Sequence, residues 1–294
     1  MPDSKQTFRP GTLWSAVVNR TRQAIEKGAL RPIATERETV EDEGVAFDVR
    51  VVSALAREAY EANPDVRPPD FDPFLPYEEE LFVANISKTH VGVLNKFPVV
   101  DNHLLIVTRA FEEQTSLLTP SDFQAFWACL QEFDGLAFYN SGQVSGASQR
   151  HKHLQVVPLP FFSDVPAIPI QPALENVIVN EGMGRSPMLP FNHAIARLDD
   201  VGGLSFLNAC ARLLEKYAAL LDAVGLGSAS DEGRAYNMLA TRRWMMLVPR
   251  SRERFHGISV NALGFAGELL VMDREQLETL RRHGPMAALI SVAI

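Results

Sequence analysis

Apolar residues recur every three or four positions in four stretches of the chain, a spacing that predicts amphipathic helices. These stretches cover residues 13–30, 120–132, 205–224 and 273–282. Thr119 followed by Pro120 is a typical helix start, because threonine can cap the first turn and proline suits its first position. Gly28 and Gly225 are suitable stops. We therefore expect helices in both halves of the chain.

Runs of alternating polarity or of β-branched residues predict strands between these helices. The runs cover residues 45–52, 81–87, 91–96, 103–108, 136–140, 151–157 and 191–197, with a hairpin over 236–249 and further segments at 259–265 and 268–272. The polar residues 32–43 are expected to form a loop. Residues 64–77 contain too many prolines for a regular helix or central strand. They predict an extended loop, held by Phe71, Phe74 and Tyr77.

A glycine-rich, polar stretch around residues 180–190 marks the expected domain boundary. It divides the chain into a first domain, 1–185, and a smaller second domain, 186–294. Asn102–Arg109 and Tyr236–Arg242 are similar over a few residues, which suggests two related halves. We expect an α+β fold, with an antiparallel sheet and flanking helices in the first half and a smaller related arrangement in the second.

The most informative chemistry lies in the strand predicted over 151–157. Residues two apart in a strand point to the same face, so His151, His153 and Gln155 should project together while Lys152 faces away. The preceding turn is rich in small polar residues that offer hydroxyl groups and closely approachable backbone N–H groups. They are Ser141, Gly142, Ser145, Gly146 and Ser148.

A neutral imidazole suits attack on phosphorus, because it carries no negative charge to repel a phosphate and its pKa lies near neutrality. Such an attack would split nucleotidyl transfer into two steps through a phospho-imidazole. Gln155 could bond a phosphoryl oxygen, and Lys96 and Lys152 are nearby cations. The residue pattern alone leaves two other interpretations open, a metal-binding face and a chance pairing of histidines that pack or lie on the surface.

The composition excludes several classes of protein. The chain has 294 residues, is 46% hydrophobic and carries a net charge of −8, which argues against broad binding of nucleic acid. Its two cysteines, Cys129 and Cys210, lie far apart, so neither a Cys-x-x-Cys zinc site nor a disulfide framework is expected. We see no signal peptide or membrane-spanning run, and we expect a cytoplasmic protein with no membrane partner.

At this point the sequence resembles a known family. Residues 146–155, Gly-Ala-Ser-Gln-Arg-His-Lys-His-Leu-Gln, are similar to the His-x-His-x-Gln signature of the histidine-triad superfamily, and more narrowly of its diadenosine tetraphosphate phosphorylases, also called ATP adenylyltransferases. Residues 94–98, 103–109, 138–142, 244–250 and 257–267 resemble the same family. The similarity therefore covers most of the chain, and it implies a histidine-triad-like fold.

The resemblance implies a reversible reaction in which diadenosine tetraphosphate and phosphate give ATP and ADP. It gives His153 the role of nucleophile, through an adenylyl-histidine, and His151 a supporting role. Gln155 stands where hydrolase branches have a third histidine, which implies that phosphate and not water accepts the adenylyl group. The residues expected to bind substrate or phosphate are Lys96, Asn140, Ser141, Gly142, Gly146, Ser148 and Gln149. No tightly bound cofactor is implied; magnesium would accompany the polyphosphate, and we see no dedicated protein ligands for it.

Two other functions compete with this one. Hexose-1-phosphate uridylyltransferases resemble a pattern with proline between the histidines, where this chain has Lys152, and they often carry a cysteine/histidine metal site. A nucleotide-binding protein without turnover would be distinguished by its failure to form a covalent adenylate. His103 is interpreted as a capping or packing residue, and residues 250–254 as a solvated basic face.

Overall fold

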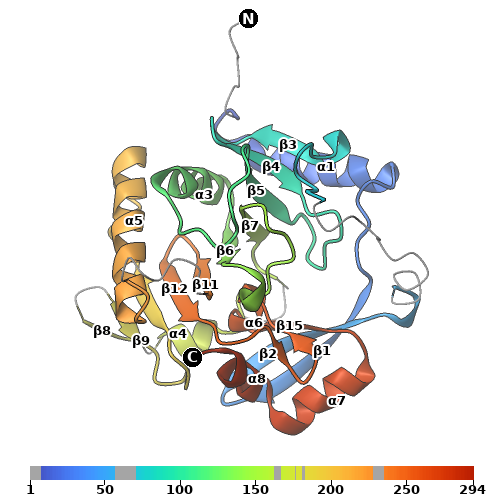
Figure 1. Ribbon diagram of the computed structural model, residues 1–294, viewed down its shortest axis with the longest axis vertical. Helices are drawn as coiled ribbons and strands as arrows, with labels where there is room; N and C mark the ends of the chain where they lie inside the picture. Colours follow the sequence, from blue (N-terminus) through green and yellow to red (C-terminus); the bar gives the residue numbers. More distant parts are fainter. Residues whose placement is uncertain (1–7, 57–70, 162–166, 176, 181–182, 228–234) are drawn as a thin grey trace, which may run out of the picture.

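The computed structural model describes residues 8–56, 71–161, 167–175, 177–180, 183–227 and 235–294. An antiparallel sheet of ten strands runs through the molecule, in the order β3-β4-β5-β7-β6-β11-β12-β10-β9-β8 (Figure 1). In this order the strands are Phe82–Asn85, His90–Leu94, Leu104–Thr108, His153–Pro158, Gly135–Asn140, Tyr236–Ala240, Trp244–Pro249, Ala194–Arg197, Met183–Arg185 and Ile178–Asn180. The expected α+β fold with a large antiparallel sheet is confirmed.

The two halves of the chain meet inside this sheet. Strand β6 of the first half pairs with β11 of the second, from Asn140 opposite Asn237 to Ala137 opposite Ala240. The sheet therefore continues without a break across the boundary that the sequence suggested near residue 186.

Three helices cover one face of the sheet: α1 (Leu13–Glu26), α3 (Pro120–Glu132) and α5 (Phe206–Ala223). Their buried residues form one hydrophobic core with alternate residues of β5, β6, β7, β11 and β12. The predicted start of α3 is confirmed, because Thr119 caps the helix that begins at Pro120 and forms a reciprocal capping box with Asp122 in the first turn. The periodic apolar stretches thus became helices because each had a sheet face on which to bury its stripe.

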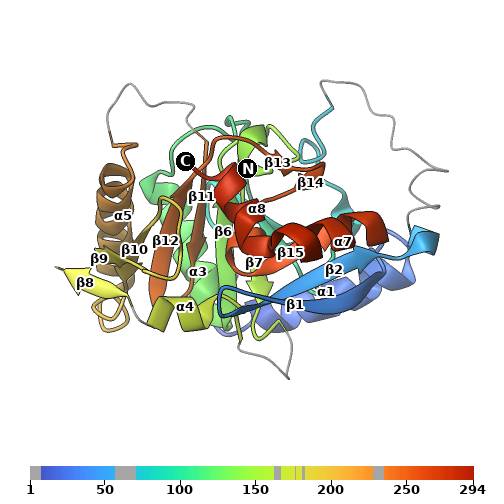
Figure 2. The same ribbon diagram turned by 90° about the horizontal axis from the view of Figure 1, so that it is seen from below.

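The opposite face carries a smaller sheet of β1 (Thr35–Asp42), β2 (Val45–Val52) and β15 (Glu268–Val271). It packs with α4 (Gln171–Glu175), α6 (Ala262–Phe265), α7 (Arg274–His283) and α8 (Pro285–Val292) around a second core (Figure 2). Strand β15 lies parallel to β2, and a 2.5 Å ion pair between Arg50 and Glu268 joins them. The last segments of the chain therefore hold the first strands in place.

The prediction of a loop over residues 32–43 is wrong. Thr35–Asp42 forms β1, which pairs with β2 along its whole length, from Thr35 opposite Val52 to Asp42 opposite Val45. The strand lacks an apolar run because it is an edge strand with no fully buried residue. Its charged side chains make polar contacts instead, including the ion pair of the partly exposed Arg37 with the buried Asp48 of β2.

No helix in the described part of the chain is both long enough and apolar enough to cross a membrane. The predicted proline-rich loop lies partly outside the described residues, which resume at Phe71. Between Phe71 and Glu78 the chain forms turns that lie against β4 and β5. Phe74 packs there on the face formed by Val91, Val93, Leu105 and Val107.

Candidate active site

A cavity of about 830 Å³ lies over the sheet face that carries His153 and Gln155. Both halves of the chain contribute to its wall. From the first half come Lys96, His103, Asn140, Gly146, Ser148, Gln149, His153 and Gln155, together with the aromatic side chains Phe71, Phe74, Tyr77 and Phe138. From the second half come Arg254, Gly257, Ser259, Asn261 and Glu268. The cavity is large enough for a ligand of nucleotide size or more.

His153 is the first residue of β7, and its backbone is fixed by a buried glutamine. Its backbone N–H donates to Gln114 Oε1 at 2.8 Å, and Gln114 Nε2 in turn donates to the carbonyl oxygens of Asn140 and His153. On the side chain, His153 Nδ1 lies 2.8 Å from the carbonyl oxygen of His151. A carbonyl oxygen only accepts, so Nδ1 carries the proton. The ring lone pair is therefore on Nε2.

Burial keeps this imidazole neutral. The side chain is 4% exposed, and burial lowers the pKa of His153 to about 4, although the hydrogen bond to His151 opposes part of this shift. At neutral pH the ring is thus uncharged, with a free lone pair at Nε2. This is the protonation state that nucleophilic attack on a phosphate requires.

His151 is buried beside His153, but its ring is occupied by the protein. Its Nδ1 lies 2.8 Å from Asp72 Oδ2, and its Nε2 lies 2.7 Å from the carbonyl oxygen of Thr108. Phe74 packs against the rings of both histidines. His151 is absent from the described wall of the cavity, and it lies ahead of β7 in an isolated bridge with Glu113. We expected the side chains of His151, His153 and Gln155 to project together. The structure places His153 and Gln155 at the cavity, but not His151.

The small polar turn after β6 divides into two parts. Asn140, Gly146, Ser148 and Gln149 line the cavity. Gly146 has φ +87°, and a Cβ atom there would lie 2.7 Å from Asn261 Cβ, so the turn packs directly on the second half of the chain. Ser141 and Gly142 lie outside the described cavity wall, and Gly142 packs against Thr115. The structure thus does not place these two predicted phosphate ligands at the cavity.

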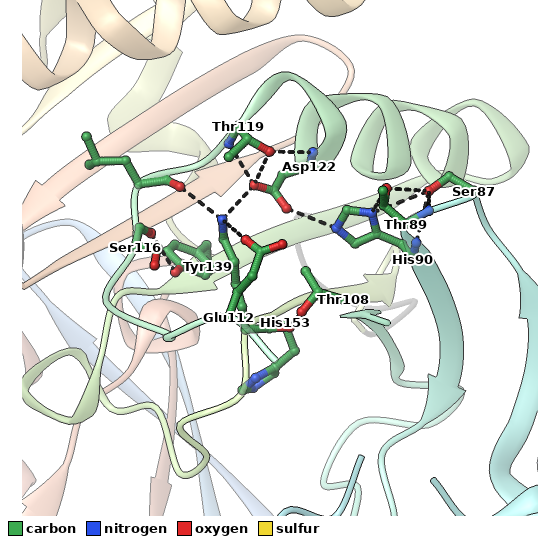
Figure 3. A network of polar contacts seen from close by, with 12 residues as sticks. Ser87, Thr89, His90, Thr108, Glu112, Ser116, Thr119, Asp122, Tyr139 and His153 are labelled. Atoms are coloured by element: carbon green, nitrogen blue, oxygen red, sulfur yellow. Dashed lines mark hydrogen bonds and ion pairs between the residues drawn. The ribbon is translucent and has the colours of Figure 1, made fainter. Parts of the chain in front are cut away.

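Lys152 points to the opposite face of the sheet, as the strand pattern predicted. Its ammonium group is completely buried and donates to Asp122 at 2.8 Å, to the carbonyl oxygen of Leu117 at 2.9 Å and to Glu112 at 3.3 Å. Asp122 also accepts from His90 Nε2 at 2.9 Å (Figure 3). Lys152 is therefore no phosphate ligand, and it anchors the strand that carries His153.

His103 belongs to the cavity wall. The interpretation of His103 as a capping or packing residue did not predict this position. His103 is 7% exposed, lies between Asn95 and Gln155, and contacts the ring of Phe138. Its place just before β5 could have suggested a role, because β5 is the direct neighbour of β7 and pairs Leu105 with Gln155.

The prediction of a solvated basic face over residues 250–254 is wrong at Arg250, whereas Arg252 and Arg254 are exposed as predicted. Arg250 is 3% exposed and donates to the carbonyl oxygens of Val292 and Arg252 and to Asn237. Arg254 begins β13 (Arg254–Phe255), which pairs with β14 (Ile258–Ser259), and it belongs to the cavity wall. Its guanidinium donates to the carbonyl oxygen of Gly257 and pairs with Glu253 at 3.1 Å. Lys96 and Arg254 are therefore the two basic residues, one lysine and one arginine, that the described cavity wall contains.

Comparisons with known proteins show the family of the chain. Residues 3–176 match the model of the Ap4A phosphorylase N-terminal domain, and residues 187–294 match the ATP adenylyltransferase C-terminal domain. Diadenosine tetraphosphate phosphorylase 2 of Saccharomyces cerevisiae is 33% identical over 244 residues, 71% of each chain. A crystal structure of yeast Ap4A phosphorylase Apa2 in complex with AMP is 28% identical and covers 97% of this chain and 97% of its own, with a TM-score of 0.76. A crystal structure of the same yeast protein in complex with Ap4A is 26% identical and covers 98% of this chain and 99% of its own, also with a TM-score of 0.76. The chain belongs to the family of Ap4A phosphorylases, or ATP adenylyltransferases.

Proposed function

We propose that this protein converts diadenosine tetraphosphate (Ap4A) and inorganic phosphate into ATP and ADP, reversibly, through an adenylyl group carried on His153. The observation that supports this most strongly is the neutral, Nδ1-protonated imidazole of His153 at the wall of a cavity of nucleotide size. The same chemistry would run in the direction of Ap4A synthesis when ATP and ADP are in excess.

In the first step, His153 Nε2 attacks the α-phosphorus of one adenosine. The N–P bond forms as the P–O bond to the leaving ATP breaks, and the imidazole becomes positively charged. The carbonyl oxygen of His151, 2.8 Å from Nδ1, stabilises that charge by accepting the Nδ1–H. This is the supporting role we assign to His151, whose ring is held between Asp72 and Thr108.

In the second step, an oxygen of inorganic phosphate attacks the same phosphorus. The new P–O bond completes ADP, the N–P bond breaks, and its electron pair returns to Nε2. The phosphate proton is released to solvent as ADP ionises, and the neutral imidazole is restored. By microscopic reversibility, the acceptor phosphate occupies the place that the γ-phosphate of the leaving ATP held.

The cavity wall offers groups for each part of the substrate. The aromatic side chains of the wall, Phe71, Phe74 and Tyr77, suit a nucleobase. The polar side chains of the wall, among them Ser148, Gln149 and Arg254, suit the polyphosphate and the acceptor phosphate. The Oδ1 of Asn140 already accepts from Asn237 and from the N–H of Ala262, which leaves its Nδ2 to donate to a phosphate. Lys96, paired with Glu78, adds a second cation.

The test is to incubate the purified protein with Ap4A, with and without inorganic phosphate, and to separate the nucleotides. We expect ATP and ADP in the presence of phosphate, and radiolabel from Ap4A bound to protein in its absence. His153→Ala should abolish both signals, while Cys210→Ala, which lies in the core on the other sheet face, serves as the control. AMP and ATP formed without phosphate would indicate a hydrolase and contradict the proposal.

A further inference from the structure

The side chain of Asn95 is held in one orientation by the backbone. The N–H of Phe97 donates to Asn95 Oδ1 at 3.1 Å, and a backbone N–H has no acceptor capacity. The amide oxygen therefore faces Phe97, and the amide nitrogen faces His103, with 3.2 Å between Asn95 Nδ2 and His103 Nδ1. Because an amide NH₂ group only donates, His103 Nδ1 is the acceptor in this contact.

This contact fixes the tautomer of His103. Burial lowers the pKa of His103 to about 4, so at neutral pH the ring carries a single proton. Nδ1 accepts from Asn95, and the proton is therefore on Nε2. His103 Nε2 is buried and has no hydrogen bond of regular geometry to the described residues. Gln155 is the neighbouring side chain that can reach it, because Leu105, two residues after His103, pairs with Gln155 on β7 and both His103 and Gln155 line the cavity. A hydrogen bond with Gln155 also raises the pKa of His103 against the effect of burial.

We infer that Asn95 and His103 are positioning residues that decide which end of the Gln155 amide faces the substrate. In this arrangement the Nε2–H of His103 donates to the amide oxygen of Gln155. The NH₂ group of Gln155 then faces the cavity that Gln155 lines. That group then donates to a phosphoryl oxygen during adenylyl transfer. The reversed amide would place an oxygen lone pair against the phosphoryl oxygens. This inference rests on the proposed function.

The charges around His103 come from few groups. On β7 it faces His153, which is neutral at neutral pH and opposes protonation of His103. Phe138 packs against it from β6. Next to Asn95, Lys96 is paired with Glu78 at 2.6 Å. A carboxylate placed at position 95 would therefore be the main new influence on this ring.

Asn95→Asp is the decisive variant, because it keeps the acceptor for Phe97 N–H and replaces the NH₂ donor by a carboxylate. The carboxylate favours a proton on His103 Nδ1 and raises the pKa of the ring. At low pH the doubly protonated ring still donates from Nε2, and Gln155 stays in place. As pH rises through the new pKa, the Nε2 proton is lost first, His103 becomes an acceptor, and the Gln155 amide reverses.

We expect kcat of Asn95→Asp for phosphate-dependent Ap4A cleavage to fall at least tenfold as pH rises from about 5.5 to 8.5, the order expected for loss of one donor to the transition state. Wild type and Asn208→Asp, the same change on the exposed surface of α5, should show no such fall. A lower kcat at every pH, without the new alkaline limb, is what a merely structural Asn95 would give, and it would overturn the inference.

A second measurement needs no turnover. In ¹⁵N NMR spectra of the unliganded wild-type protein at pH 7, with His103 assigned from a His103→Gln variant, we expect a protonated Nε2 and an unprotonated Nδ1. The Nδ1-protonated tautomer would refute the inference whatever the activity. Absence of phosphate-dependent turnover in wild type would instead refute the proposed function, so the two failures are distinguishable.

Discussion

Removal of the Lys152 ammonium should destabilise the protein strongly, although it lies on the sheet face opposite the cavity. The group is completely buried, and its three protons are donated to Asp122, Leu117 and Glu112 (Figure 3). Burial alone would raise the pKa of Asp122, but the hydrogen bond from His90 and the charge of Lys152 outweigh it and lower that pKa to about 2. Against the ordinary value of 3.8, this shift corresponds to about 2 kcal/mol of net stabilisation of the carboxylate.

In Lys152→Met, Asp122 keeps His90 and Thr119 as donors but loses its buried cation, and the carbonyl oxygen of Leu117 loses its donor. Breaking a buried pair from one side costs about 3–5 kcal/mol, because the remaining charge is left uncompensated. We expect a decrease of that size in the free energy of unfolding. The additional loss of Asp122, in Lys152→Met/Asp122→Leu, should cost less than the two single changes together, by about 1–3 kcal/mol.

Urea unfolding at pH 7, followed by circular dichroism and by tryptophan fluorescence, measures these values. Arg212→Met is the control, because Arg212 pairs with Asp200 and Glu215 on the exposed surface of α5 and should cost about 1 kcal/mol or less. A loss below 1 kcal/mol for Lys152→Met, or strict additivity in the double variant, would refute the view that this network is a coupled buried unit.

Three further predictions concern the site itself. Gln155→His should shift the acceptor from phosphate toward water, and unchanged phosphate dependence of product formation would contradict our account of Gln155. Arg254→Gln should raise KM for inorganic phosphate about tenfold or more, as loss of one charge-assisted contact does, whereas Arg252→Gln, an exposed neighbour outside the described cavity wall, should not. The folded protein holds His103 and His153 in the unprotonated state, so the free energy of unfolding should keep its full value above pH 6.5 and decrease between pH 6.5 and about 4. The decrease should reach up to about 3 kcal/mol for each histidine. A denaturant midpoint of unfolding that stays constant from pH 7 to 4.5 would contradict this.

Local patterns predicted the parts of the site that local geometry determines. Strand alternation was sufficient to place His153 and Gln155 on one face and Lys152 on the other, because the side-chain period of a strand is two. The capping pattern at Thr119 and Pro120 located the start of α3 for a similar reason, since a cap involves only the first turn.

Partners distant in sequence were beyond the reach of these patterns. The ring of His151 is oriented by Asp72, a residue of the proline-rich loop, and no periodicity connects the two. Arg250 looked like part of a solvated basic run because a charge pattern does not reveal that its guanidinium is buried against Asn237 and the carbonyl oxygens of Val292 and Arg252. Strand β1 was missed because an edge strand needs few apolar residues when its partner supplies the buried face.

The boundary near residue 186 divides the sequence, but it does not divide the site. Asn140 belongs to the first half, yet its Oδ1 is held by Asn237 Nδ2 at 2.7 Å and by the N–H of Ala262 at 3.0 Å, both from the second half. Asn237 is itself fixed by the buried guanidinium of Arg250. If the first half were separated, Asn140 would lose both donors and its amide would be free to turn its oxygen toward the phosphates. In the reaction we propose, the second half would therefore contribute to the chemistry of His153 by fixing the orientation of a side chain that the first half supplies.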